Sequence, residues 1–174
     1  MLTSLDKLLD RLGLLFKWLA TVCLLVMVAL NMVNVILRAT LDHALDWVFP
    51  WTLLLFAWML FFGFFAIVRQ KRDVVVDILM VRLPKPLRIA GGLFACAIGM
   101  LFMIAILRAA PDLIALQSAN MDMIDLPIWT RSAPLFLSAI MVFLHMLLNF
   151  ILIALGQVVP FVKAPALEAM DEAS

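Results

Sequence analysis

The sequence is poor in charged residues. Only 14% of its 174 residues are Asp, Glu, Lys or Arg, whereas 67% are hydrophobic. An average soluble domain has about 25% charged and about 45–50% apolar residues. A soluble fold of this size could not hide so much apolar surface from water, so lipid must be the solvent for most of the chain. The net charge of +1 and the lack of a long Lys/Arg run give no indication of nucleic-acid binding.

Residues that carry redox or catalytic chemistry are also scarce. The two cysteines, Cys23 and Cys96, both fall inside apolar stretches, which disfavours a disulfide, a metal site or a thiol oxidoreductase. A haem-bearing bundle needs axial ligands at membrane depth, and only His145 qualifies, because His43 lies in a loop. No nucleophile lies in an arrangement with a base. We therefore expect no enzymatic activity and no cofactor.

Long apolar runs dominate what is present. Residues 53–68 carry no charge and are followed by Arg69, Lys71 and Arg72. Because a bilayer requires about 20 apolar residues per helix, this run predicts a membrane span. We expect an all-α integral membrane protein with four transmembrane helices and short interfacial amphipathic segments. The expected segments are an N-terminal amphipathic lead-in (1–17), a transmembrane domain (18–159) with spans at about 18–37, 50–68, 89–107 and 133–159, and a tail (160–174).

The distribution of basic residues predicts the orientation. Ten of the 13 Lys and Arg residues fall in the lead-in, in the loop between spans two and three, or in the tail. The positive-inside rule then places both termini in the cytoplasm. In the loop on that side, residues 74–83 are apolar but too short to cross, which indicates an interfacial or re-entrant segment. The expected membrane anchors are Trp47, Trp51 and Trp129, and the residues expected near lipid phosphates are Arg69, Arg72, Arg82 and Arg88.

A few polar and small residues inside the spans need an explanation. Asn31, Asn34 and Arg38 would share one face of span one, either for hydrogen bonds between helices or as a contact stripe for a partner helix. His145 and Asn149 are four residues apart, and a hydrogen-bonded structural histidine is favoured over a proton relay. In span three, small residues recur at every fourth position, namely Gly91, Ala95 and Gly99, with Gly92 and Cys96 alongside, which permits close packing within the domain or against another subunit.

The ordered set of motifs resembles the small, four-span membrane subunit of the TRAP (tripartite ATP-independent periplasmic) transporters. The matching features are Asn34 to Arg38 at the end of span one, Pro50-Trp51 opening span two, the aromatic helix with Phe56, Trp58 and Gly63, the Val75, Asp77, Leu83 and Pro84 segment, and Pro127, Trp129 and Pro134 before span four. Thr52 to Leu54 and Asp73 depart from the family pattern, so roles of the residues found there in relatives are not carried over.

The resemblance implies a non-catalytic scaffold subunit of a sodium-coupled, binding-protein-dependent transporter for small organic acids. Its partners would be a large multi-span transport subunit, a periplasmic substrate-binding protein and membrane phospholipids. The residues expected at the large subunit are Asn31, Asn34, Arg38, Phe56, Trp58, Phe61 and Gly63, and the acids expected at the binding protein are Asp122 and Asp125.

The absence of acids from the middle of the spans agrees with a subunit that does not itself carry solute, because ion-coupled carriers normally use intramembrane acids or broken helices. Two other hypotheses remain. The chain could oligomerise into a self-contained channel or carrier, with Asn31, Asn34, His145 and Asn149 as its polar lining. It could also be a membrane-bound enzyme or electron carrier built on His145.

Overall fold

A computed structural model describes residues 2–42, 45–69, 84–121, 124–158 and 160. The elements in chain order are α1 (Leu2–Leu41), α2 (Val48–Arg69), α4 (Lys85–Leu116), β1 (Asn120–Met121), β2 (Ile124–Pro127) and α5 (Trp129–Ala154). Within these residues, four helices are long and apolar enough to cross a membrane, which confirms the predicted fold class. Residues 74–83 and most of the expected tail lie outside the described residues.

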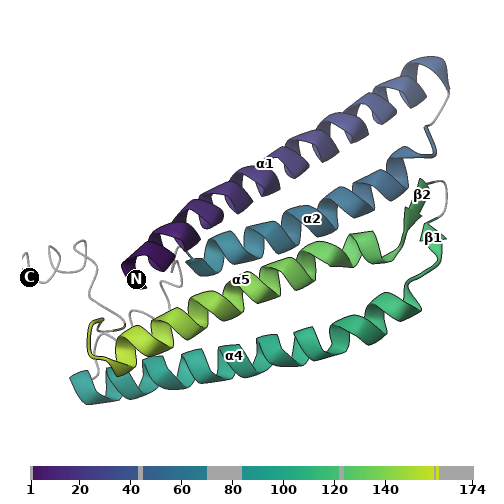
Figure 1. Cartoon of the computed structure of the whole chain (residues 1–174). Coiled ribbons are helices and arrows are strands. Elements are labelled where there is room, and N and C mark those ends of the chain that lie inside the picture. The colour runs from purple at the N-terminus through teal and green to yellow at the C-terminus, as the bar shows by residue number, and fades with distance from the viewer. Residues whose placement is uncertain (1, 43–44, 70–83, 122–123, 159, 161–174) are drawn as a thin grey trace, which may run out of the picture.

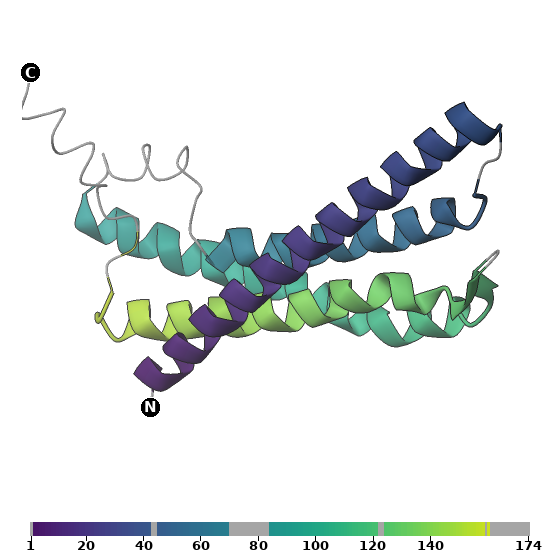
Figure 2. The same cartoon turned by 90° about the horizontal axis from the view of Figure 1, so that it is seen from above.

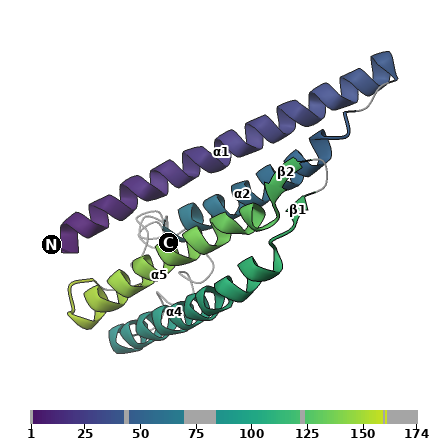
Figure 3. The ribbon, with the colours of Figure 1, turned by 45° about the vertical axis from the view of Figure 1, so that its right-hand side comes forward.

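The four helices lie side by side in the order α1, α2, α5, α4, as Figure 1 shows. The main contacts join α1 to α2, α2 to α5, and α5 to α4, and a smaller contact joins α1 to α5. Figure 3 shows the same order, with α1 and α4 at the two edges. The protein is therefore a single layer of helices with two broad faces.

The two ends of the layer differ. At one end lie the N-terminus of α1 and the C-terminal end of α5, and at the other end lie the two strands (Figure 1). We call these the N-terminal end and the hairpin end. Figure 2 shows that α1 crosses the other helices obliquely, so that its last turns diverge from them at the hairpin end.

The N-terminal lead-in is part of α1 and not a separate surface helix. α1 has 40 residues, which corresponds to roughly 60 Å, about twice the hydrocarbon thickness of a bilayer. Leu9 and Phe16 are buried in the core, and the Phe16 ring lies 5.1 Å from the rings of both Phe62 and Phe65. The lead-in is therefore not a helix lying separately on the membrane surface, because its apolar face packs on α2, and α1 has no break at residue 17.

The main core lies where α1, α2 and α5 meet and includes one residue of α4. Its buried members are Leu9, Phe16, Phe62, Phe65, Met103, Ala139 and Val142. Phe65 has no exposed surface and is the largest of the fully buried side chains. Edge-to-face aromatic contacts add about 0.5–1.5 kcal/mol per pair beyond the burial of apolar area. This cluster therefore fixes how α1 sits on α2.

A glycine ends α5 earlier than the apolar pattern predicts. The sequence extends span four to about residue 159, whereas α5 ends at Ala154. Gly156 has a φ of +68° and its N–H donates to the carbonyl of Ile153. A glycine in the left-handed region just past a helix is a common helix terminator, because it has no Cβ to clash. Gln157 and Val158, which follow it, are therefore not part of the helix.

Two short strands connect α4 to α5. The sequence predicts that span three continues through Gln117 and turns near Asn120. α4 does continue to Leu116, and the chain then forms the antiparallel pair of β1 and β2, which the sequence analysis did not predict. The N–H of Ile128 donates to the carbonyl of Ala119 at 2.9 Å, which closes the hairpin against the start of α5.

Candidate partner interface and polar cluster

The polar cluster at the N-terminal end is centred on Arg69, the last residue of α2. Its guanidinium pairs with the carboxylates of Asp6 and Asp10 on α1, with 2.8 Å between Nη2 and Asp10 Oδ1. It also lies 2.9 Å from Nδ1 of His145 on α5. The Arg69 side chain is only 10% exposed. One side chain thus joins three helices.

The partners of His145 define its protonation state. An arginine can only donate hydrogen bonds, so Nδ1 of His145 must accept one and the ring is neutral with its proton on Nε2. The amide of Asn149 lies 3.0 Å from that Nε2, and the proton there requires the amide oxygen of Asn149 to face it. His145 is 2% exposed. These contacts support a structural histidine.

The four arginines expected at lipid phosphates do not share one environment. The prediction that Arg69 lies at lipid phosphates is wrong, because its side chain is only 10% exposed and pairs with two acids of the protein. Arg88 is half-buried, and its Nη2 donates to the carbonyl of Pro160 at 3.1 Å. Arg72 and Arg82 lie outside the described residues. The signal that was missed for Arg69 is the pair of acids at positions 6 and 10, which are one helical turn apart.

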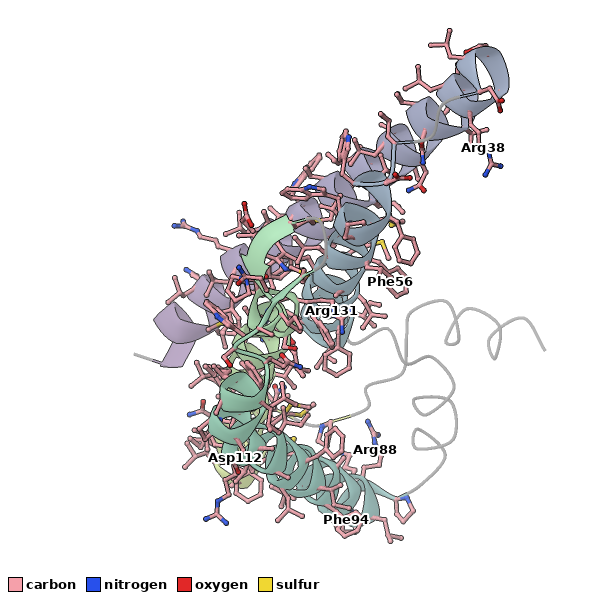
Figure 4. The ribbon with its side chains drawn as sticks, turned by 90° about the vertical axis from the view of Figure 1, so that its right-hand side faces the viewer. Arg38, Phe56, Arg88, Phe94, Asp112 and Arg131 are labelled. Atoms are coloured by element: carbon pink, nitrogen blue, oxygen red, sulfur yellow. The ribbon has the colours of Figure 1, made fainter. Side chains whose placement is uncertain are left out.

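The asparagines of α1 make contacts within the chain. Asn31 Nδ2 donates to Oγ1 of Thr52 on α2 at 2.9 Å. Asn34 Oδ1 accepts a hydrogen bond from the N–H of Leu45 at 2.8 Å. The Asn31 bond agrees with the interhelical interpretation of the stripe, whereas the Asn34 bond holds the connection between α1 and α2. Arg38, at the divergent end of α1, is exposed (Figure 4).

The aromatic residues of α2 expected at a partner point in different directions. Trp58 Nε1 donates to the carbonyl of Thr130 at 3.0 Å and joins α2 to α5. Gly63 faces α1, since a Cβ there would lie 4.0 Å from Ala20 Cβ. Phe61 is half-buried, whereas Phe56 is 47% exposed. Of these residues, Phe56 is therefore the best placed to contact another protein.

Phe56 belongs to a continuous apolar row, which we call the α2 stripe. Its residues recur at intervals of three and four, and all are 40% exposed or more: Phe49, Leu53, Phe56, Leu60, Phe64 and Ile67. Such spacing places them on one face of a helix. The sequence could not reveal the stripe, because α2 is apolar on every face and periodicity gives no signal in such a helix.

The small residues of α4 pack against α5 mainly through Gly92 and Cys96, the two that lie alongside the series of every fourth position. Gly92, Cys96 and Met103 are buried, whereas Ala95 is exposed. A Cβ on Gly99 would lie 3.5 Å from Met146 Sδ on α5. Gly99 therefore meets α5 as the close-packing interpretation expects, but the contact face follows Gly92 rather than Ala95.

The remaining expected site residues lie at the hairpin end. Trp47, Trp51 and Trp129 are all partly exposed there, and their role as membrane anchors stays a prediction. Asp125 is exposed on β2, and Asp122 lies outside the described residues. Within the described part of the chain, no group of three or more His, Cys, Asp or Glu residues could hold a metal ion.

Comparison with known protein families identifies the chain's relatives. The family model for the tripartite ATP-independent periplasmic transporters, DctQ component, matches residues 27–156, well over half of the chain. No curated protein and no solved structure matches it. The matched region contains less than half of α1, from residue 27 onward, and all of the other helices. The chain is thus a multi-pass membrane protein and belongs to the family of the small DctQ component of the TRAP transporters.

Proposed function

We propose that this small TRAP component is a scaffold that holds a large transport subunit and does not itself carry solute. The observation that supports this proposal best is the open layer of helices. The spans lie in one row, α1, α2, α5, α4, rather than around a central space (Figures 1 and 3). A carrier or pore needs a polar path across the membrane. The single layer formed by the described helices encloses no such path, so we expect a partner to supply it.

The scaffold would serve a sodium-coupled, binding-protein-dependent transporter of small organic acids in the bacterial inner membrane. Both termini would be cytoplasmic, as the distribution of Lys and Arg predicts. The hairpin end would then face the periplasm, where Asp122 and Asp125 are candidates to contact the binding protein. Arg72 and Arg82 remain candidates for lipid phosphates on the cytoplasmic side.

The part of the α2 stripe from Phe56 to Ile67 is the surface that we assign to the large subunit. It replaces the larger set of residues expected from the sequence, because Asn31, Asn34, Trp58 and Gly63 are occupied inside the chain. Phe56 and the exposed Arg38 remain from that set. Between membrane helices, van der Waals packing drives association, and large rings offer extensive contact area.

A binding experiment tests this assignment. The tagged chain, purified in mild detergent with its multi-span neighbour, should lose at least about tenfold in affinity when Phe56 and Phe64 are both replaced by Ala, the change expected if two anchors of a hot spot are removed. The matched control is Leu137→Ala with Leu144→Ala, because those α5 side chains are 43% and 42% exposed. Equal retention of the neighbour by both double variants would contradict the assignment.

The contact with the binding protein has its own test. Charge reversal at Asp122 and Asp125 should slow uptake at low salt and have less effect at high salt, because exposed charges are screened. Unchanged uptake at low salt would remove these acids from the proposal.

A further inference from the structure

A cavity opens at the hairpin end, between the start of α2 and the start of α5. Its volume is about 610 Å³. Asp46 and Arg131 line it together with an apolar group formed by Phe49, Pro50 and Leu53. Figure 4, seen from the hairpin end, shows Arg131 and Phe56 on the same side of the layer. The cavity therefore lies at the end of the α2 stripe.

The cavity presents one acid and one base, and neither has a hydrogen-bond or ion-pair partner among the described residues. Both Asp46 and Arg131 are exposed. Within the part of the chain that the structure describes, neither side chain makes a hydrogen bond or an ion pair, with the other or with a third group. The charges at the cavity wall thus sum to zero but are separated in space. Such a wall is complementary to a ligand that carries both signs.

The surroundings place the cavity at the level of lipid headgroups. Trp47 directly follows Asp46, Trp51 lies two residues after Phe49, and Trp129 lies two residues before Arg131. All three indoles are between 37% and 43% exposed, and tryptophan is enriched where the hydrocarbon meets water. Phe49, Pro50 and Leu53 then offer apolar contact on the side of the cavity that α2 forms.

We propose that this cavity binds one phospholipid with a zwitterionic, amine-bearing headgroup, from the leaflet at the hairpin end. The Arg131 guanidinium would donate to the phosphate, and the Asp46 carboxylate would accept from the ammonium. The glycerol and first methylene groups would lie on Phe49, Pro50 and Leu53. An anionic lipid without the amine would face Asp46 with no compensating partner. The inference does not rest on the scaffold function.

Lipid exchange measured by native mass spectrometry tests the proposal. The delipidated chain would be offered phosphatidylethanolamine, phosphatidylcholine or phosphatidylglycerol of identical acyl composition. We expect phosphatidylethanolamine to be retained roughly tenfold better than phosphatidylglycerol, the size of effect that one charge-assisted hydrogen bond gives. Phosphatidylcholine should fall between them, because its quaternary ammonium keeps the charge but has no N–H to donate.

Matched variants locate the site. Arg131→Gln should lower retention of all three lipids, and Asp46→Asn should abolish the preference for phosphatidylethanolamine. The controls are Arg38→Gln and Asp125→Asn, which change exposed charges that do not line the cavity. Equal effects of control and cavity variants, or no preference between lipids in the unaltered chain, would overturn the proposal.

A photocrosslinker at position 53, in the complex with the large subunit, distinguishes a lipid from a protein occupant. Benzophenone in place of the Leu53 side chain should label a phospholipid. Labelling of the large subunit alone would overturn the proposal and assign the cavity to a protein segment.

Discussion

Arg69 Nη1 lies 2.9 Å from His145 Nδ1, and this contact links the last residue of α2 to the middle of α5. On its other side the same guanidinium holds Asp6 and Asp10 of α1. A buried cation needs partners of opposite charge or strong acceptors, because its desolvation is expensive. The cluster supplies them from two helices and thereby sets the position of α1 at the N-terminal end.

Replacement of Arg69 by Gln should destabilise the fold by roughly 1–3 kcal/mol, because it leaves His145 and two carboxylates without their shared donor. Thermal unfolding in mild detergent measures the loss. Arg11→Gln is the control, since Arg11 is exposed on α1 at the same end and should have little effect. An Arg69 variant as stable as the Arg11 variant would show that the cluster does not hold α1.

Two replacements of His145 should lower the stability by different amounts, and Leu should lower it more than Asn. His145→Leu removes the acceptor for Arg69 and should lower stability by about 1–3 kcal/mol, the penalty for a buried donor left without a partner. His145→Asn places an amide oxygen near the position of Nδ1 and should retain part of that stability. The reverse order in unfolding measurements would contradict the neutral, accepting histidine.

The cluster around Arg69 shows which structural features a sequence pattern can predict and which depend on tertiary packing. Spans and fold class follow from the apolar runs, which depend only on local composition. The partner of Arg69 depends on how α1 crosses α2, and no local pattern encodes that crossing. The basic turn after span two therefore indicated a lipid-facing arginine, whereas tertiary packing brings Asp6 and Asp10 to it.

The candidate partner interface on α2 shows the same difference between features that local sequence predicts and features that depend on packing. The predicted partner residues of α2 were chosen for their type, and the structure separates the exposed Phe56 from Trp58 and Gly63, which face other helices. In a soluble helix, hydrophobicity marks the buried face, but in lipid both faces are apolar. Only the packing of the four helices distinguishes the two.

Trp58→Phe tests the connection between α2 and α5. The variant keeps an aromatic ring but loses the 3.0 Å hydrogen bond to the carbonyl of Thr130, and we expect a loss of about 1 kcal/mol. Trp51→Phe is the matched control, because Trp51 is 37% exposed and no side-chain hydrogen bond is seen for it among the described residues. Equal unfolding midpoints for the two variants would argue against this bond.

Two glycines should respond in opposite directions to replacement by Ala. A Cβ at Gly92 would lie 2.6 Å from Pro160 Cγ, which is too close for a ring that cannot move aside as a flexible side chain can. Gly92→Ala should therefore destabilise by about 1–3 kcal/mol. At Gly63 the nearest atom is 4.0 Å away, so Gly63→Ala should stabilise α2 by about 0.5–1 kcal/mol. Similar midpoints for both variants in thermal unfolding would contradict the packing of α4 on this end of α5.

The most direct test of the scaffold function is uptake into proteoliposomes under an imposed sodium gradient. Vesicles that contain this chain alone should take up no organic acid above the level of empty vesicles, and vesicles with the large subunit and the binding protein should take it up. Removal of this chain from the complete set should abolish that uptake. Sodium-driven uptake by this chain without companions would contradict the account.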